Sequence, residues 1–251
     1  MQDHMQVKNY PGVALVGLLA GVFLFGCQLQ QEKPNSAQIE TVGMKAMQQA
    51  DASAERKLMA WSAQNMPVAQ RELALLYQTR PEQRAESLKL FEQAAHGGDV
   101  DAAYQLGEML RVGVAGVPAA PAAAAPWYAM AARQNHARAA LMLGMLYKNG
   151  DGVARDDGQA AHWLNIASGL GNPHAMFLLS YIYREGRGVA QDGAQARQLL
   201  EEAAEHEYPP AIQELAMTVQ LGDALSPKDE RRAGYLLKEA AEHRHNNWNR
   251  F

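Results

Sequence analysis

The sequence predicts an all-α protein, a right-handed solenoid of about five helix–turn–helix repeats. The first observation behind this prediction is that small residues recur at a nearly fixed interval, since Ala102, Ala139, Ala175 and Ala211 lie 37, 36 and 36 positions apart. The second is that a Gly-containing turn and another helical pattern follow each of the two central copies. A period in this range is typical of solenoids, in which each unit buries its apolar face only against its neighbours.

The first helix of each unit carries an apolar face and one small residue beside it. In the best-preserved copies the pattern is A-x-x-x-L-[GS]-x-x-Y, beginning at Ala139 and at Ala175. Its first, fifth and ninth positions fall on one side of a helix, which we expect to face the core. The small residue next to the leucine predicts a close approach of two helices, and it is Gly107, Gly144, Ser180 or Ala216 in successive units.

The turn and the second helix also have readable physical roles. Gly152 and Gly188 are expected to adopt backbone angles that other residues avoid, reversing the chain. Asp156 and Asp192 stand where a carboxylate can accept the free N–H groups of the following helix. In the last unit we expect Pro227 at the first helical position. One slot of the second helix is predicted to be core in four units: Trp127, Trp163, Leu199 and Leu236.

These patterns resemble the Sel1-like repeat, a relative of the tetratricopeptide repeat with a longer, Gly-containing loop between its helices. The resemblance is carried by the first-helix pattern, by G-x-G-V, and by the D-x-x-x-A-x-x-W-x-x-x-A spacing that begins at Asp156. Three units depart from it: that of Ala102 has a longer loop, that of Ala211 lacks the second glycine, and that of Ala69 has almost no loop. The resemblance implies a superhelix whose first helices line a concave side where partners dock.

The start of the chain reads as an export signal. Lys8 precedes an uncharged apolar run, residues 13–25, which is shorter than the roughly 20 residues that a membrane span needs. The run leads into Gly26 and Cys27, the only cysteine, which resembles a bacterial lipobox. The resemblance implies cleavage before Cys27 and its diacylation; the alternative is an ordinary signal peptide with a coincidental cysteine. Gln28 then favours an outer-membrane lipoprotein that faces the periplasm.

Composition and pattern together divide the chain into five segments. We expect a signal peptide at 1–26, a flexible tether at 27–35, N-terminal capping helices at 36–65, the repeat solenoid at 66–245 and a tail at 246–251. The tether is polar and contains proline, as linkers do. The translation start could be Met1 or Met5, since the second would remove Asp3 from the positively charged region.

The sequence contains no pattern of residues that predicts catalysis. Its histidines do not share a repeat position, and the lone cysteine belongs to the leader. The formal charge of −4 argues against non-specific nucleic-acid binding. We therefore expect no enzyme, no metal and no cofactor. A cell-wall enzyme is the less favoured reading, because only Glu108 offers a carboxylate on the expected inner face.

What remains is a surface on the outward side of the first helices. Positions 3 and 7 of the pattern point away from the expected core, yet they hold apolar and aromatic residues. An apolar stripe flanked by cations suits a protein interface, and the alternative is that these residues pack against the neighbouring first helix. The predicted partner-binding set is Tyr104, Leu141, Met145, Phe177, Tyr181 and Met217, with a row of cations formed by Arg111, Lys148 and Arg184.

The expected function is non-catalytic binding of another protein in the periplasm. The resemblance implies two roles for a lipoprotein of this kind. One is an immunity protein that neutralises a delivered toxin, including effectors of type VI secretion. The other is a scaffold or adaptor for envelope assembly, such as exopolysaccharide export. A compact chain favours an immunity or adaptor role over a large export scaffold, and the partner's identity is left open.

Overall fold

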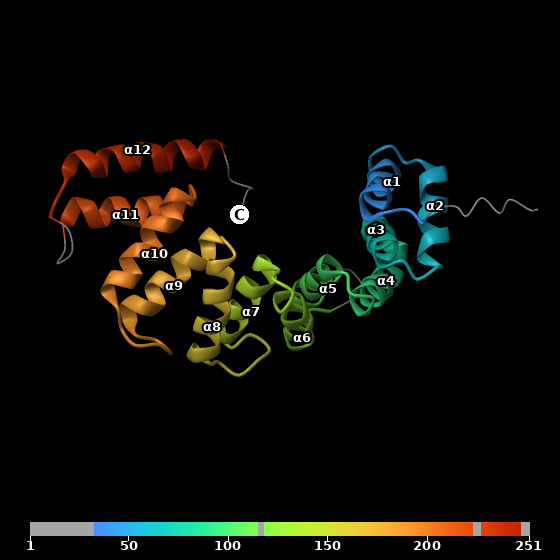
Figure 1. Ribbon diagram of the computed structural model, residues 1–251, viewed down its shortest axis with the longest axis horizontal. Coiled ribbons are helices and arrows are strands. Elements are labelled where there is room, and N and C mark those ends of the chain that lie inside the picture. The colour runs from blue at the N-terminus through green and yellow to red at the C-terminus, as the bar shows by residue number, and fades with distance from the viewer. Residues whose placement is uncertain (1–32, 115–117, 223–226, 247–251) are drawn as a thin grey trace, which may run out of the picture. The chain divides into compact units, whose positions relative to one another are not determined.

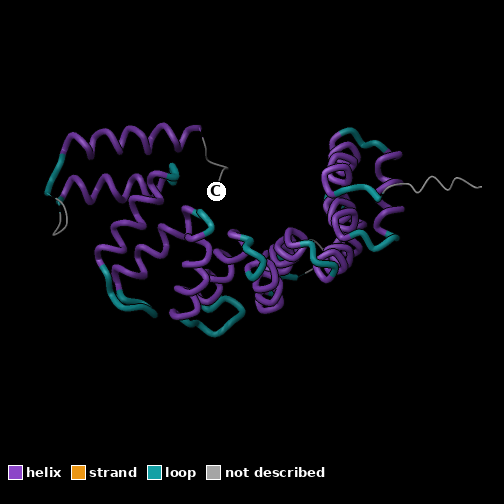
Figure 2. The backbone as a smooth tube through the Cα atoms, viewed as in Figure 1, coloured by secondary structure: helices purple, strands orange, loops and turns teal. Residues whose placement is uncertain are grey.

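The computed structural model describes residues 33–114, 118–222 and 227–246, and every regular element in these ranges is a helix (Figures 1 and 2). The elements are α1 (Ser36–Gln48), α2 (Ala52–Ser62), α3 (Pro67–Gln78), η1 (Pro81–Gln83), α4 (Arg84–His96), α5 (Val100–Val112), α6 (Pro121–Ala132), α7 (Ala137–Asn149), α8 (Asp157–Gly169), α9 (Pro173–Glu185), α10 (Gly193–Glu205), α11 (Pro209–Leu221) and α12 (Glu230–Asn246). None of these helices is long and apolar enough to span a bilayer.

The helices belong to one unit that starts at Asn35 and is built by packing neighbours in chain order. Helices pair as α3 with α4, α5 with α6, α7 with α8, α9 with α10 and α11 with α12, and the second helix of each pair contacts the first of the next. Before them, α1 packs on both α2 and α3, and α3 begins at Pro67 as the sequence predicts. The all-α solenoid is confirmed.

Close helix approach depends on the small residues of the first helices. A Cβ atom placed on Gly107 would lie 2.7 Å from the ring of Tyr128, and one placed on Gly144 would lie 2.8 Å from Leu164 Cγ. Both partner side chains are fully buried. In these two pairs the second helix thus packs almost directly on the backbone of the first, as predicted.

The position of the second helix that we expected to lie in the core is buried in only two of the four units. Trp163 and Leu199 are buried, but Trp127 and Leu236 are half-buried. The next residue along the helix is buried in three units, where Tyr128, Leu164 and Leu200 are exposed by 0%, 0% and 6%. In α12 the corresponding residue, Leu237, is 42% exposed. No following helix pair among the described residues covers it.

The caps of the second helices follow the prediction in two units and correct it in the third. Asp156 accepts a hydrogen bond from the backbone N–H of Gln159 at 2.9 Å, and Asp192 does the same with Gln195 at 3.0 Å. In the last unit Pro227 is not at the first helical position. Asp229 is the cap instead, because its carboxylate accepts hydrogen bonds from the backbone N–H groups of Arg231 and Arg232. The first residue of α12 is therefore Glu230.

The loop glycines serve two purposes, of which the sequence analysis identified one. Gly152 and Gly188 have the predicted positive φ, +73° and +69°. Each also lies directly against the start of the previous unit's second helix: Gly188 against the backbone of Asp157 and Gly158, and Gly152 against that of Ala122. The turns are therefore contacts between repeats as well as reversals of the chain.

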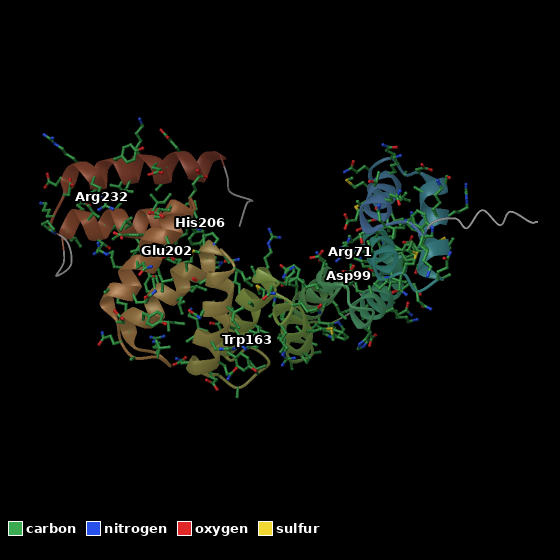
Figure 3. The ribbon with its side chains drawn as sticks, viewed as in Figure 1. Arg71, Asp99, Trp163, Glu202, His206 and Arg232 are labelled. Carbon is green, nitrogen blue, oxygen red and sulfur yellow. The ribbon has the colours of Figure 1, made fainter. Side chains whose placement is uncertain are left out.

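Arg71 joins the N-terminal helices to the first two repeats. It is only 8% exposed, and its guanidinium lies 2.6 Å from Glu40, 3.0 Å from Glu72 and 2.8 Å from Asp101. Asp99, which caps α5, lies 3.7 Å away, and Figure 3 shows these two side chains together. The carboxylates come from α1, α3 and α5, so one buried cation connects three helices.

This arrangement, which we call the Arg71 cluster, contains more negative than positive charge. Burial raises the pKa of Glu72 and of Asp99 despite their proximity to Arg71. One guanidinium shared among four carboxylates does not offset the loss of hydration at the two buried ones. The Glu72 carboxylate also occupies the space where a side chain would stand on Gly43, in the middle of α1.

We predict that Gly188→Val will lower the free energy of unfolding by about 2 kcal/mol or more. The positive φ disfavours a β-branched residue, and its Cβ would overlap the backbone at Asp157. Gly193→Ala is the matched control, because an added Cβ there meets nothing within 4 Å. Chemical denaturation of both variants measures the difference, and equal stability would show that the turn is not under this constraint.

A second prediction concerns pH. Burial raises the pKa of Glu72 in the folded state. The protonated Glu72 therefore stabilises the fold at low pH, and this contribution to the free energy of unfolding is lost as the pH rises through that pKa. Glu72→Gln removes this loss, so its stability relative to wild type should increase between pH 4 and pH 7. Glu55 gives the opposite sign, because its hydrogen bond to Arg80 lowers its pKa. Glu55→Gln should therefore lose relative stability as the pH rises through the acid range up to about 4.5, the ordinary pKa of the carboxyl, and should change little above it. The same dependence on pH in both variants would contradict the assignment.

Candidate functional site

Two adjoining hollows lie along the first helices of the early repeats. One, of about 530 Å³, is lined by α3, α5 and the start of α7. The other, of about 640 Å³, is lined by α5, α7 and the start of α9. They share Tyr104, Ala137 and Arg138, and we call the two together the groove.

Part of the predicted partner-binding set lines this groove. Tyr104, Arg111, Leu141 and Met145 are in its wall, whereas the rest of the set is not among its lining residues: Lys148, Phe177, Tyr181, Arg184 and Met217. The expectation of a solvated position is wrong for Leu141, which is 8% exposed. Both α6 and α8 contact α7, so the buried side of this helix is wider than the stripe read from the sequence.

Tyr104 forms the aromatic centre of the groove. Its ring stacks on that of His136, with centroids 4.6 Å apart. His136 caps α7 by accepting from the N–H of Ala139, and its Nε2 lies 3.4 Å from Asp101. Burial lowers the pKa of His136, which favours the neutral ring. This wall is thus a fixed, largely uncharged surface suited to packing.

Glu108 and Arg111 are engaged with each other and with a buried tyrosine. The Tyr128 hydroxyl donates to Glu108 at 2.5 Å, and Arg111 pairs with Glu108 at 2.8 Å. Burial, followed by the bond to Glu108, raises the pKa of Tyr128. Arg111 is therefore neutralised within its own helix, and the one carboxylate expected on this face is already bonded.

Phe177 and Tyr181 connect α9 to α11. Their rings meet edge to face with centroids 5.1 Å apart, and Phe177 lies 5.5 Å from the ring of Tyr208, which precedes α11. Arg184 stands 4.1 Å above the Tyr181 ring and pairs with Glu214 of α11 at 2.9 Å. Packing against the neighbouring first helix thus accounts for these half-buried side chains. Their role in binding stays a prediction, as does that of Met217, which is 50% exposed on α11.

Two cations on α7 have no ion pair among the described residues: Lys148, from the predicted row, and Arg138, which the sequence analysis missed. Arg138 is exposed and lines both hollows. Lys148 lies near His174 at the other end, where burial and then this ammonium lower the pKa of the imidazole. Arg138 could have been found by extending the stripe of Leu141 and Met145 by one turn.

The described residues hold no group of three or more His, Cys, Asp or Glu side chains arranged to bind a metal. Cys27, the predicted lipid site, falls outside the described residues. What the geometry offers is a groove with an aromatic wall, an apolar floor on α7 and Arg138 in its lining, with Lys148 further along α7.

Comparison with known proteins identifies the repeat. The Sel1 repeat matches five times in succession, at residues 67–99, 100–136, 137–172, 173–208 and 209–245, which correspond to the helix pairs from α3 to α12. None of the curated proteins matches the chain. Two solved structures are similar in sequence and fold. A Sel1 repeat protein from Oxalobacter formigenes is 30% identical with a TM-score of 0.71, covering 80% of this chain and 84% of its own.

The second is c5321 of uropathogenic Escherichia coli, described as a protective antigen with an SLR fold. It is 27% identical with a TM-score of 0.72 over 83% of this chain, and this chain spans 46% of that longer structure. The immunity protein PA5088 of Pseudomonas aeruginosa, 20% identical with a TM-score of 0.51 over 86% of each chain, shares the fold. With five consecutive matches over most of its length, the chain belongs to the Sel1 repeat family.

Proposed function

We propose that this protein binds another protein through the groove and catalyses no reaction. The observation that carries the proposal is the groove itself: half-buried Tyr104 and Met145 line it together with Arg138, which has no ion pair among the described residues. When a partner covers half-exposed apolar side chains, their surface is removed from water, and this lowers the free energy of the complex. The Sel1 repeat is a protein-binding fold, which supports the same reading.

The finer proposal is that the partner is a toxin and that this chain is its immunity protein in the periplasm. It is motivated by the use of a similar fold, over nearly equal lengths, in a Pseudomonas aeruginosa protein described as an immunity protein. At 20% identity the likeness concerns the fold, so the toxin and the binding residues must be established for this chain directly.

The location is a proposal as well. An immunity protein against a periplasmic toxin has to stand where the toxin arrives, and a lipid on Cys27 would hold it at the membrane. The first helix begins a few residues after Cys27, because Asn35 caps α1 and forms a complete capping box with Gln38. A short polar tether would then separate the lipid from the folded unit.

We expect Met145→Lys to abolish protection against a secreted toxin encoded beside this gene, and to weaken toxin binding at least tenfold. The charge would stand in the middle of the apolar part of the groove and would lose hydration on binding. The melting temperature should change little, because lysine can keep its head group in water. Met59→Lys is the matched control, since Met59 is 48% exposed on α2, outside the groove.

If Met145→Lys protects and binds like wild type, the groove is not the binding site. If wild type protects against no neighbouring toxin, the immunity role is wrong. Binding of an envelope-assembly component would then identify the scaffold role instead.

The lipid anchor has its own test. Cys27→Ser should move the protein from the membrane fraction to the soluble periplasmic fraction, because the thiol is the site of acylation. Labelling with a fatty-acid analogue should be lost together with membrane association. Identical fractionation of wild type and variant would show that Cys27 is not an anchor.

A further inference from the structure

We propose that one side of α7, formed by Arg138, Leu141, Met145 and Lys148, recognises an acidic segment of the partner in which two carboxylates flank an apolar residue. We call these four residues the α7 stripe. The inference rests on the proposed function and specifies the chemistry of the segment that the groove receives.

The stripe is continuous because of its spacing. Its members follow one another at intervals of three, four and three residues within α7, so they lie along one side of the helix. At a rise of 1.5 Å per residue the two cations are about 15 Å apart along the axis. Two carboxylates four residues apart in an extended segment point to the same side and span about 13 Å, which the long side chains of the two cations can match.

Both cations are available to a partner, unlike the other cations of the first-helix face. Arg71 is surrounded by carboxylates, Arg111 pairs with Glu108, and Arg184 pairs with Glu214. Arg138 and Lys148 form no ion pair within the described part of the chain. A partner carboxylate at either place would gain a charge pair without displacing one.

Their positive charge acts inside the groove. After burial, which is the larger cause, the field of Lys148 lowers the pKa of His174 in the groove wall. Burial is the larger cause of the lowered pKa of His136 and of the raised pKa of Tyr104. Arg138 lowers both pKa values, but Asp101 at His136 and Glu108 at Tyr104 raise them more strongly. The positive field is therefore unopposed at the Lys148 end of α7, and nearby carboxylates offset it at the Arg138 end.

The centre of the stripe selects an apolar side chain. Leu141 forms a buried floor, and Met145 is half-buried with a flexible thioether that adapts to the shape of its partner. A carboxylate placed here would lose hydration without gaining a cation. The order cation, apolar, apolar, cation thus matches a segment with the order acid, apolar, acid.

The groove also fixes where such a segment can lie. At its α3 end the Arg71 cluster places four carboxylates around one guanidinium, and Asp101 from this cluster is in the wall. An acidic segment is repelled from this end and attracted to the α7 end, so charge confines it to one half of the groove.

The test uses the full-length chain and a fluorescent peptide, Asp-Ala-Phe-Ala-Glu, with its amide counterpart Asn-Ala-Phe-Ala-Gln. Fluorescence anisotropy should show at least tenfold tighter binding of the acidic peptide, with an affinity that falls as salt is added. Arg138→Glu and Lys148→Glu should each weaken its binding about tenfold. Lys57→Glu is the matched control, because Lys57 is an exposed cation on α2 with no ion pair in the described structure.

Equal affinity for the two peptides, or no detectable binding of either at about 1 mM, overturns the proposal. So does an equal loss in the Lys57 variant. Preferential binding of anionic phospholipid vesicles, lost in the same α7 variants, would assign the stripe to a membrane surface and also overturn it. Should a charge-reversed variant unfold, Arg138→Gln and Lys148→Gln keep the fold and should lose about threefold each.

The outcome separates this inference from the proposed function. If Met145→Lys abolishes toxin binding while Arg138→Glu and Lys148→Glu do not, the groove binds its partner without the acidic contacts. If all three variants bind like wild type, the groove itself is not the site.

Discussion

The whole structure depends on helices that approach one another more closely than ordinary side chains allow. Gly107 and Gly144 have no Cβ, and the space is filled by Tyr128 and Leu164 from the second helix of the pair. Each pair buries little apolar surface alone, so its stability depends on the next pair. Gly188, a loop glycine, lies directly on the backbone of the preceding repeat and so joins two neighbouring pairs. The groove exists because this packing holds the first helices side by side at a fixed spacing.

Charge is distributed along this face in a way that the net charge of −4 conceals. The α3 end is acidic, and Glu108 and Arg111 neutralise each other in the middle. On α7, Arg138 and Lys148 have no ion pair in the part of the chain that the structure describes. Tyr128 of α6 contributes to this pattern, because its ring packs beside Gly107 and its hydroxyl donates a hydrogen bond to Glu108. A core residue thus helps decide which cations remain available at the surface.

The sequence predicts the fold well because the repeat period, the small residues and the caps are local signals that recur. The site is less predictable, for reasons that differ by residue. The pairing of Glu108 with Arg111 follows from their spacing of three on a helix and could have been anticipated. The pairing of Arg184 with Glu214 joins residues 30 positions apart and needs the packing of α9 near α11. Leu141 is 8% exposed although the pattern of its own helix places it opposite the core face, so its burial depends on packing that a single-helix pattern does not reveal.

The Arg71 cluster makes the two ends of the solenoid unequal. At the N-terminal side, Gly43 of α1 receives the Glu72 carboxylate, so this end is closed by a specific polar contact that an ordinary repeat helix would not reproduce. At the other side, Leu237 is 42% exposed at a position that is buried in the preceding repeats, so a further helix pair would find apolar surface to cover. Repeats could therefore be added by duplication behind α12 but not ahead of α3. Lengthening the array, by evolution or by engineering, has one permitted direction.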